Sequence, residues 1–194
     1  SLNSPQNVLL TNNATVTFNC SSSSGSSLKN ITLYTNKSSW SQNGSANISG
    51  TQNSSAFIRT LTDGSYKWNC LAYDSTGNSS FASSNYTLTI DTIPPQSITN
   101  LANKSRGDSW IYWNWTNPAV DFNHTEIWLN GTFKQNITAN YYNATGLLGN
   151  TEYQIQTRTV DDTRNINTSG VNSTAKTASD IIAPVVTIVY PANN

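Results

Sequence analysis

The two cysteines of the chain each lie within a run of alternating apolar and polar residues. Residues 14–20 end in Cys20 and residues 66–73 contain Cys70, with each cysteine on the apolar side of its run. Alternation with a period of two is typical of a β-strand that buries one face. The pattern therefore predicts two strands whose cysteines point inward, joined by a disulfide between the two sheets of a sandwich. The alternative is a pair of buried free thiols.

A disulfide between the two cysteines would affect the stability of the protein and would indicate the cellular compartment in which it is found. A bridge between Cys20 and Cys70 would close a loop of about fifty residues, a constraint worth on the order of 4 kcal/mol in the chain-entropy account. Disulfides persist in oxidising surroundings, so the pairing favours an exported protein. Two cysteines without a nearby histidine do not form a metal-ligand set, and we expect neither a metal site nor a cofactor.

Turn signals enclose the second cysteine run and recur later in the chain. Asp-Gly at 63–64 precedes the run, and Asp-Ser-Thr-Gly-Asn at 74–78 follows it. Downstream, a strand-like run at 152–160 leads into residues 161–165, where Asp, Arg and Asn repeat the spacing of Asp, Gly and Asn in 74–78. This second copy has no cysteines. The repetition predicts two β-sandwiches in series.

Proline-containing segments divide the chain into parts. Proline fixes its own φ and has no N–H group to give to a sheet, so we interpret the Thr-Ile-Pro-Pro segment as a linker. The expected parts are a domain at residues 1–91, a linker at 92–95, a second domain at 96–180, and a segment at 181–194 that holds another linker and a strand.

The composition and periodicity restrict the fold class. Helical periodicity is absent, and we predict an all-β fold of two seven-stranded antiparallel sandwiches with a C-terminal strand for an adjoining unit. No apolar run approaches the ~18 residues of a membrane span. Charged residues form 10% of the sequence and the net charge is zero, against about a quarter charged in ordinary soluble domains. This balance argues against nucleic-acid binding and against attraction to anionic membranes.

Glycosylation sequons of the type Asn-x-Ser/Thr are abundant. The chain has seventeen, whereas a shuffled chain of this composition would have about eight. The excess predicts an extracellular surface that carries N-linked glycans in place of charged groups. The sequons begin at Asn13, Asn19, Asn30, Asn36, Asn43, Asn47, Asn53, Asn78, Asn85, Asn103, Asn114, Asn123, Asn130, Asn136, Asn143, Asn167 and Asn172.

A set of aromatic, glycine and turn residues marks the second half of the chain: Trp113, Trp115, Leu147, Gly149, Tyr153, Val160 and Asp161. At these spacings the segment resembles a fibronectin type III domain. The resemblance implies that the early Trp fills the core and that Tyr153 forms a tyrosine corner, with its hydroxyl bonded to the backbone. Leu148 stands where the family commonly has a proline before the glycine.

The first half resembles the immunoglobulin-like modules of bacterial and archaeal surface proteins. The residues that carry this resemblance are Asp-Gly-Ser-Tyr at 63–66 and the turn at 74–78. Trp68 stands two residues before Cys70, where antibody-type domains have Tyr, so the segment departs from that branch of the family. Both resemblances imply fold more strongly than function, because these folds host many functions.

The final segment repeats earlier parts of the chain. Residues 180–184 match the linker at 91–95 in the spacing of Asp and Pro, and residues 187–193 align with residues 1–7. The tail is therefore predicted to be the first strand of another copy of the first domain, either in a covalent tandem array or as a donor strand for the next subunit. Head-to-tail addition does not close on itself and makes a filament. An ordinary tail is the third possibility. The predicted inter-unit strand residues are Val185, Val186, Ile188 and Tyr190.

The sequence offers few residues that could act in catalysis. His124 is the only histidine, so no Ser-His-Asp or Cys-His set with a second base is available. Asp161 and Asp162 are adjacent in a turn, and we interpret them as turn-capping residues; the alternative is a calcium site that they form together with Asn165. We predict that the protein is not an enzyme.

Two functions remain as predictions. The first is a structural subunit or repeat of a glycosylated extracellular fibre of the archaeal surface type, whose partners are copies of itself and its N-linked glycans. The second is a carbohydrate-binding accessory module of a secreted enzyme, since exposed aromatic rings can stack on sugars. The candidate platform residues are Trp40, Trp110, Trp128, Tyr112, Tyr141 and Tyr142.

Overall fold

The computed structural model describes residues 1–181 and 183–187, and within them all regular structure is β, which confirms the predicted class. The chain divides into two compact units. The first comprises Ser1–Ile93 and Thr163–Asn165, and the second comprises Pro94–Asp162 and Ile166–Asn194.

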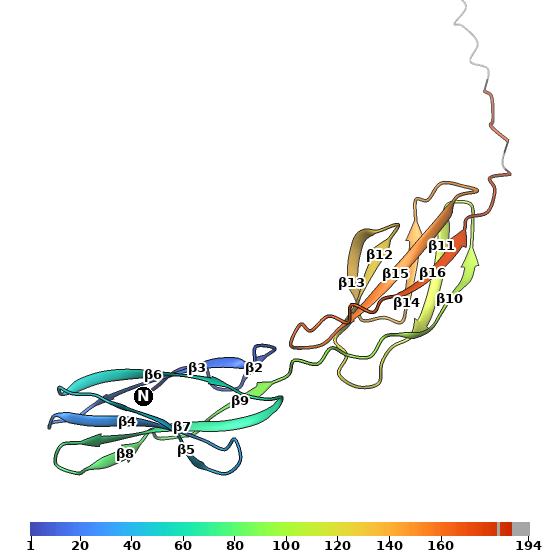
Figure 1. Ribbon diagram of the computed structural model, residues 1–194. Helices are drawn as coiled ribbons and strands as arrows, with labels where there is room; N and C mark the ends of the chain where they lie inside the picture. The colour runs from blue at the N-terminus through green and yellow to red at the C-terminus, as the bar shows by residue number, and fades with distance from the viewer. Residues whose placement is uncertain (182, 188–194) are drawn as a thin grey trace, which may run out of the picture. The chain divides into compact units, whose positions relative to one another are not determined.

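The first unit is a sandwich of two sheets (Figure 1). One sheet has the strand order β1-β3-β6, and the other has the order β2-β9-β7-β4-β5, with β8 paired to β7. The strands are β1 (Leu2–Ser4), β2 (Leu9–Thr11), β3 (Thr15–Ser23), β4 (Leu28–Thr35), β5 (Ser41–Asn47), β6 (Gln52–Thr60), β7 (Gly64–Asp74), β8 (Ser79–Phe81) and β9 (Tyr86–Ile90).

The first eleven residues contribute to both sheets of this sandwich. β1 pairs antiparallel with β3, whereas β2 pairs parallel with β9. Pro5 lies between the two strands and has no N–H to continue a ladder. The chain therefore leaves one sheet at the proline and joins the other, which adds short strands to a seven-stranded core.

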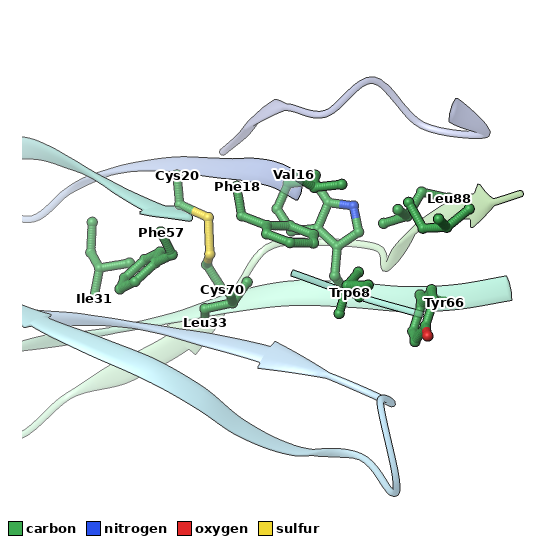
Figure 2. Packing of buried hydrophobic residues seen from close by; sticks show 12 residues of the cluster. Val16, Phe18, Cys20, Ile31, Leu33, Phe57, Tyr66, Trp68, Cys70 and Leu88 are labelled. Atoms are coloured by element: carbon green, nitrogen blue, oxygen red, sulfur yellow. A yellow bond between two sulfur atoms is a disulfide. The ribbon is translucent and has the colours of Figure 1, made fainter. Parts of the chain in front are cut away.

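The interior of the first unit is built around the disulfide and Trp68 (Figure 2). Cys20 on β3 and Cys70 on β7 are bonded, with Cα atoms 6.4 Å apart. The predicted disulfide between the two sheets is thus confirmed. Trp68 and Phe18 are both fully buried, and their rings meet edge to face with centroids 5.1 Å apart, a favourable aromatic geometry.

The second unit is a sandwich with the sheet orders β10-β11-β14 and β13-β12-β15-β16. Along β11, Ile111, Trp113 and Trp115 are buried while Tyr112 and Asn114 are half-buried on the other face. This alternation confirms the expected core role of the early Trp. The strands are β10 (Thr99–Arg106), β11 (Trp110–Thr116), β12 (His124–Leu129), β13 (Thr132–Ile137), β14 (Tyr141–Thr145), β15 (Glu152–Val160) and β16 (Val171–Lys176).

Each unit has a tyrosine whose hydroxyl bonds to the backbone just before a long strand. The Tyr153 hydroxyl accepts a hydrogen bond from the Leu148 N–H at 2.9 Å, so the predicted tyrosine corner is confirmed. In the first unit the Tyr66 hydroxyl donates to the main-chain oxygen of Thr62 at 2.8 Å. This second corner was not predicted from the sequence, although the Asp-Gly-x-Tyr spacing at 63–66 indicates it.

The turns after β7 and β15 have the same backbone feature. Gly77 has φ of 92° and Arg164 has φ of 71°, so both adopt the left-handed region at the matching position of the repeated turn. Glycine does so without steric cost, whereas a residue with a Cβ atom is strained there. The repeated spacing seen in the sequence thus corresponds to a repeated backbone path.

Candidate glycosylation sites and terminal segment

The sequon asparagines share one property: every one of the seventeen is exposed or half-buried. Among the residues that the structure describes, the buried asparagines are Asn69 and Asn165, with exposures of 3% and 9%. Neither begins a sequon. On strands this follows from the period of two, because Asn114 and Asn143 alternate with the buried Trp113 and Ala144.

The amide nitrogen Nδ2 is the atom that a glycan would join, and in five sequons it already donates a hydrogen bond within the protein. The donors are Asn43, Asn53, Asn78, Asn123 and Asn167. In the other twelve, no Nδ2 hydrogen bond forms within the described part of the chain. These twelve are Asn13, Asn19, Asn30, Asn36, Asn47, Asn85, Asn103, Asn114, Asn130, Asn136, Asn143 and Asn172.

Asp74 explains why one of the five amides is engaged. Its carboxylate accepts hydrogen bonds from the Thr76 hydroxyl at 2.7 Å and from the Asn78 Nδ2 at 3.2 Å. The main-chain N–H groups of the same two residues also donate to it, at 3.0 and 2.9 Å. These bonds, with the Thr76 hydroxyl first among them, lower the pKa of Asp74 from 3.8 to about 2, while burial acts in the opposite direction. Asp74 is therefore a structural anion that closes the turn.

The six candidate platform aromatics lie in separate places. Tyr112 and Tyr141 stack on the outer face of β11 and β14 with centroids 5.5 Å apart. Trp128, on the other sheet of the second unit, lies against Phe133 and under the Arg158 guanidinium. Tyr142 packs against the core of the second unit, Trp110 is half-buried at the start of β11, and Trp40 belongs to the first unit. A single six-residue platform is therefore ruled out.

The candidate chemical groups have structural hydrogen-bond partners. The His124 Nδ1 lies 2.7 Å from the Asn123 Oδ1. Asp162 accepts a hydrogen bond from the Asn123 Nδ2, and Asp161 is buried. Within residues 1–181 and 183–187, no serine, threonine or cysteine is hydrogen-bonded to the histidine.

The C-terminal segment is exposed as far as the structure describes it. Val185 and Val186 are 90% and 84% exposed, and Ile181 is 92% exposed. Residues 183–187 have no regular structure in the single chain. The other two predicted strand residues, Ile188 and Tyr190, lie outside the described residues.

A hollow of about 320 Å³ lies between the sheets of the first unit, next to the disulfide. It is lined by Ser1 and by residues 21–23 at the end of β3. β1 pairs with β3 at Leu2–Cys20 and at Ser4–Asn19, and the main chains of Ser1 and Ser21 are also hydrogen-bonded, whereas β3 continues to Ser23. The edge of β3 at Ser22 and Ser23 therefore has space beside it for another extended segment.

Comparison with known proteins gives information on fold. No protein-family model matches the sequence, and no curated protein matches it. No helix of the described residues is long and apolar enough to cross a membrane.

Solved structures of other β-sandwich proteins are similar to this chain in fold. Fibronectin(III)-like modules of Clostridium thermocellum CbhA match 97% of this chain over 99% of their own, with a TM-score of 0.56 and 12% identity. Domains from titin match 89% of this chain over 62% of their own, with a TM-score of 0.63 and 12% identity. Together with the sheet orders, these likenesses place both units among fibronectin type III and immunoglobulin-like sandwiches. At this identity they establish the fold and leave function to the site.

Proposed function

We propose that this chain is a non-catalytic structural unit of an extracellular fibre, coated with N-linked glycans and joined head to tail to further units. The proposed glycan coat is supported by the different exposure of asparagines inside and outside sequons. All seventeen sequon asparagines reach the surface, and the two buried asparagines are outside sequons. Neutral glycans hydrate a surface independently of pH, which suits a protein with 10% charged residues.

The exposed tail supports the head-to-tail part. Val185 and Val186 are large apolar residues left in water, and such segments commonly mark an interaction site. Because Thr187 aligns with Ser1, the two valines correspond to positions just before β1. That place borders the free end of β3 and the hollow beside the disulfide. A strand there would be joined to β1 covalently in a tandem array, or would come from another subunit by strand addition.

Mass spectrometry of the protein from its native source tests the glycan part. We expect peptides that contain sequons to be heavier, by the mass of a glycan, than their amino-acid composition accounts for. The fraction of molecules that carry a glycan should be higher at the twelve sequons whose Nδ2 makes no hydrogen bond with the described residues than at the five whose Nδ2 donates one. A hydrogen-bonded amide is less available for attachment of the glycan. Sequon peptides that all have their bare amino-acid mass would rule out the glycan coat.

Electron microscopy followed by hot SDS tests the assembly part. We expect filaments, and SDS then separates the two modes: a tandem array stays a long polypeptide, whereas a strand-exchanged fibre yields single units. For the second mode, Val185→Asp with Val186→Asp should abolish filaments, because charge opposes burial beside the disulfide. Val120→Asp is the matched control, since Val120 is 71% exposed on a loop of the second unit. Single chains without filaments in the unmodified protein would overturn this part.

A further inference from the structure

Trp40 and Phe81 form an exposed aromatic pair on the first unit. Their side chains are 42% and 41% exposed, and their ring centroids lie 6.4 Å apart. Tyr34 on β4 contacts both rings, with centroid distances of 6.1 Å to Trp40 and 5.1 Å to Phe81. The pair borders a hollow of about 380 Å³, a size within the range of about 300–1,000 Å³ found for small-ligand sites.

Asn85, the first residue of a sequon, lines the same hollow, and a buried neighbour fixes its orientation. The Asn69 Oδ1 accepts hydrogen bonds from the N–H groups of Cys70 and Ala82 at 2.7 and 3.2 Å. Because an N–H group can only donate, these bonds identify the oxygen end of the Asn69 amide. The Asn69 Nδ2 then donates to the Asn85 Oδ1 at 2.9 Å.

These hydrogen bonds determine which atom of the Asn85 side-chain amide remains available for a glycan. Its oxygen is held by Asn69, which also donates to the main-chain oxygens of Ala82 and Ser84 and so fixes the loop between β8 and β9. The Asn85 Nδ2 is the opposite end of the amide and has no hydrogen-bond partner among the described residues. The atom that would carry a glycan is thus free, on a residue that the fold holds beside two exposed aromatic rings.

We propose that the hollow is the seat of the protein's own glycan: a sugar attached to the Asn85 Nδ2 folds back and stacks on Trp40 and Phe81. This inference rests on the proposed glycan coat and names a site where one of its glycans contacts the protein. The aromatic pair is then covered within each chain and is not a receptor for external carbohydrate.

The chemistry of the hollow fits an uncharged sugar. Its lining is made of Trp40, Asn69, Phe81 and residues 82–85, none of which is ionisable. A pyranose ring presents a face of C–H groups, and the negative face of an aromatic ring attracts the positive edge of such bonds. The serines and the asparagines supply hydrogen-bonding groups at the border for the sugar hydroxyls.

Covalent attachment makes a weak contact sufficient. A group on a short flexible tether has an effective concentration in the millimolar range. A sugar–aromatic contact with a dissociation constant of about 1 mM would then be formed in roughly half of the molecules or more. The same contact would capture little free sugar from dilute solution, so attachment at Asn85 is what makes the hollow useful.

Glycopeptide mass spectrometry and NMR of the whole glycosylated chain test the proposal without any substitution. We expect a glycan on Asn85, and ring-proton signals of its sugar shifted upfield by the aromatic ring currents relative to the sugar on Asn13. Asn13 is the matched reference, because its Oδ1 also accepts a hydrogen bond, from the Thr15 N–H, and its Nδ2 is free.

A double-mutant cycle measures the coupling. Thr87→Val removes the Asn85 sequon, and should lower the Tm of the first unit by about 4 °C when Trp40 is present but by about 1 °C or less with Trp40→Ala. The lost hydroxyl contact between Thr87 and Asn7 is the same in both backgrounds and cancels. Thr15→Val, which removes the Asn13 sequon, should give equal shifts in both backgrounds. If Trp40→Ala does not fold, Phe81→Ala replaces it.

The outcomes separate this inference from the proposed glycan coat. A bare Asn85 on a chain glycosylated elsewhere overturns only the inference, as does a glycosylated Asn85 with neither an upfield shift nor coupling to Trp40. Binding of free oligosaccharide to a chain with an empty Asn85 would also overturn it, in favour of an external ligand. A chain with no glycan at any sequon overturns both proposals.

Discussion

Replacing Tyr66 with Phe tests the hydrogen bonding of one hydroxyl group in the first unit. The Tyr66 hydroxyl donates to the main-chain oxygen of Thr62 at 2.8 Å and lies 3.1 Å from the Thr62 hydroxyl. The side chain is 7% exposed and belongs to the core, and Phe keeps all of its apolar contacts. We therefore expect Tyr66→Phe to lower the free energy of unfolding by about 1 kcal/mol, the usual net value of an intramolecular hydrogen bond.

The chain provides a replicate and a control for this change. Tyr153→Phe removes the bond from the Leu148 N–H at 2.9 Å and should cost a similar amount in the second unit. Tyr86→Phe is the control: Tyr86 packs against Trp68 in the first unit, and its hydroxyl makes no hydrogen bond with the described residues. We expect Tyr86→Phe to change the free energy of unfolding by less than about 0.5 kcal/mol, the usual range for substitutions that break no hydrogen bond and leave no cavity.

Urea unfolding provides the measurement, because a pure stability change moves the midpoint and leaves the m-value unchanged. A loss of 1 kcal/mol also corresponds to a fall in Tm of about 4–8 °C for a domain of this size class. The reasoning is refuted if Tyr66→Phe and Tyr86→Phe have the same stability, since the corner would then contribute nothing beyond the ring.

Three further predictions concern the disulfide, the Asp74 turn and the Arg164 turn. Replacing both Cys20 and Cys70 with Ala should lower the free energy of unfolding by about 2–5 kcal/mol. Calorimetry that shows an unchanged Tm of the first unit would contradict the expected stabilisation by the disulfide. Because the pKa of Asp74 is lowered from 3.8 to about 2, its contribution is complete above pH 4 and should be lost as the pH falls through about 2. Asp74→Asn should remove that part of the acid dependence, and identical acid-unfolding curves would refute it. Arg164→Gly should stabilise the chain by about 1 kcal/mol and Gly77→Ala should destabilise it, since both positions have positive φ; urea midpoints that move the other way would show that side-chain contacts outweigh backbone strain.

Much of the fold could be predicted from local sequence. Alternation of apolar and polar residues determines which face of a strand is buried, and this gave the inward positions of Cys20, Cys70 and Trp113. The spacing of Tyr153 after Gly149 located one tyrosine corner. The same periodicity explains why the sequon asparagines within strands lie on the outer faces, since they alternate with core residues.

The candidate glycan seat could not be predicted in this way. Trp40 and Phe81 are far apart in the sequence and meet only because both contact Tyr34. Asn69 reads as a polar residue in an alternating strand, yet it is buried and holds the oxygen of Asn85. No local pattern indicates that pairing.

The amino-acid sequence by itself thus determined most of the strands, their buried faces and the number of sequons, because these depend on neighbours within a few residues. It also indicated the disulfide, because the chain has two cysteines and both lie on the apolar side of a strand-like run. Only the tertiary structure decided that residues before and after Pro5 join different sheets, that five sequon amides already donate hydrogen bonds, and that Asn85 lines the same hollow as an aromatic pair. Those features depend on strand order and on loop paths, which bring distant segments together through hydrogen bonds and ring contacts with no counterpart in sequence spacing.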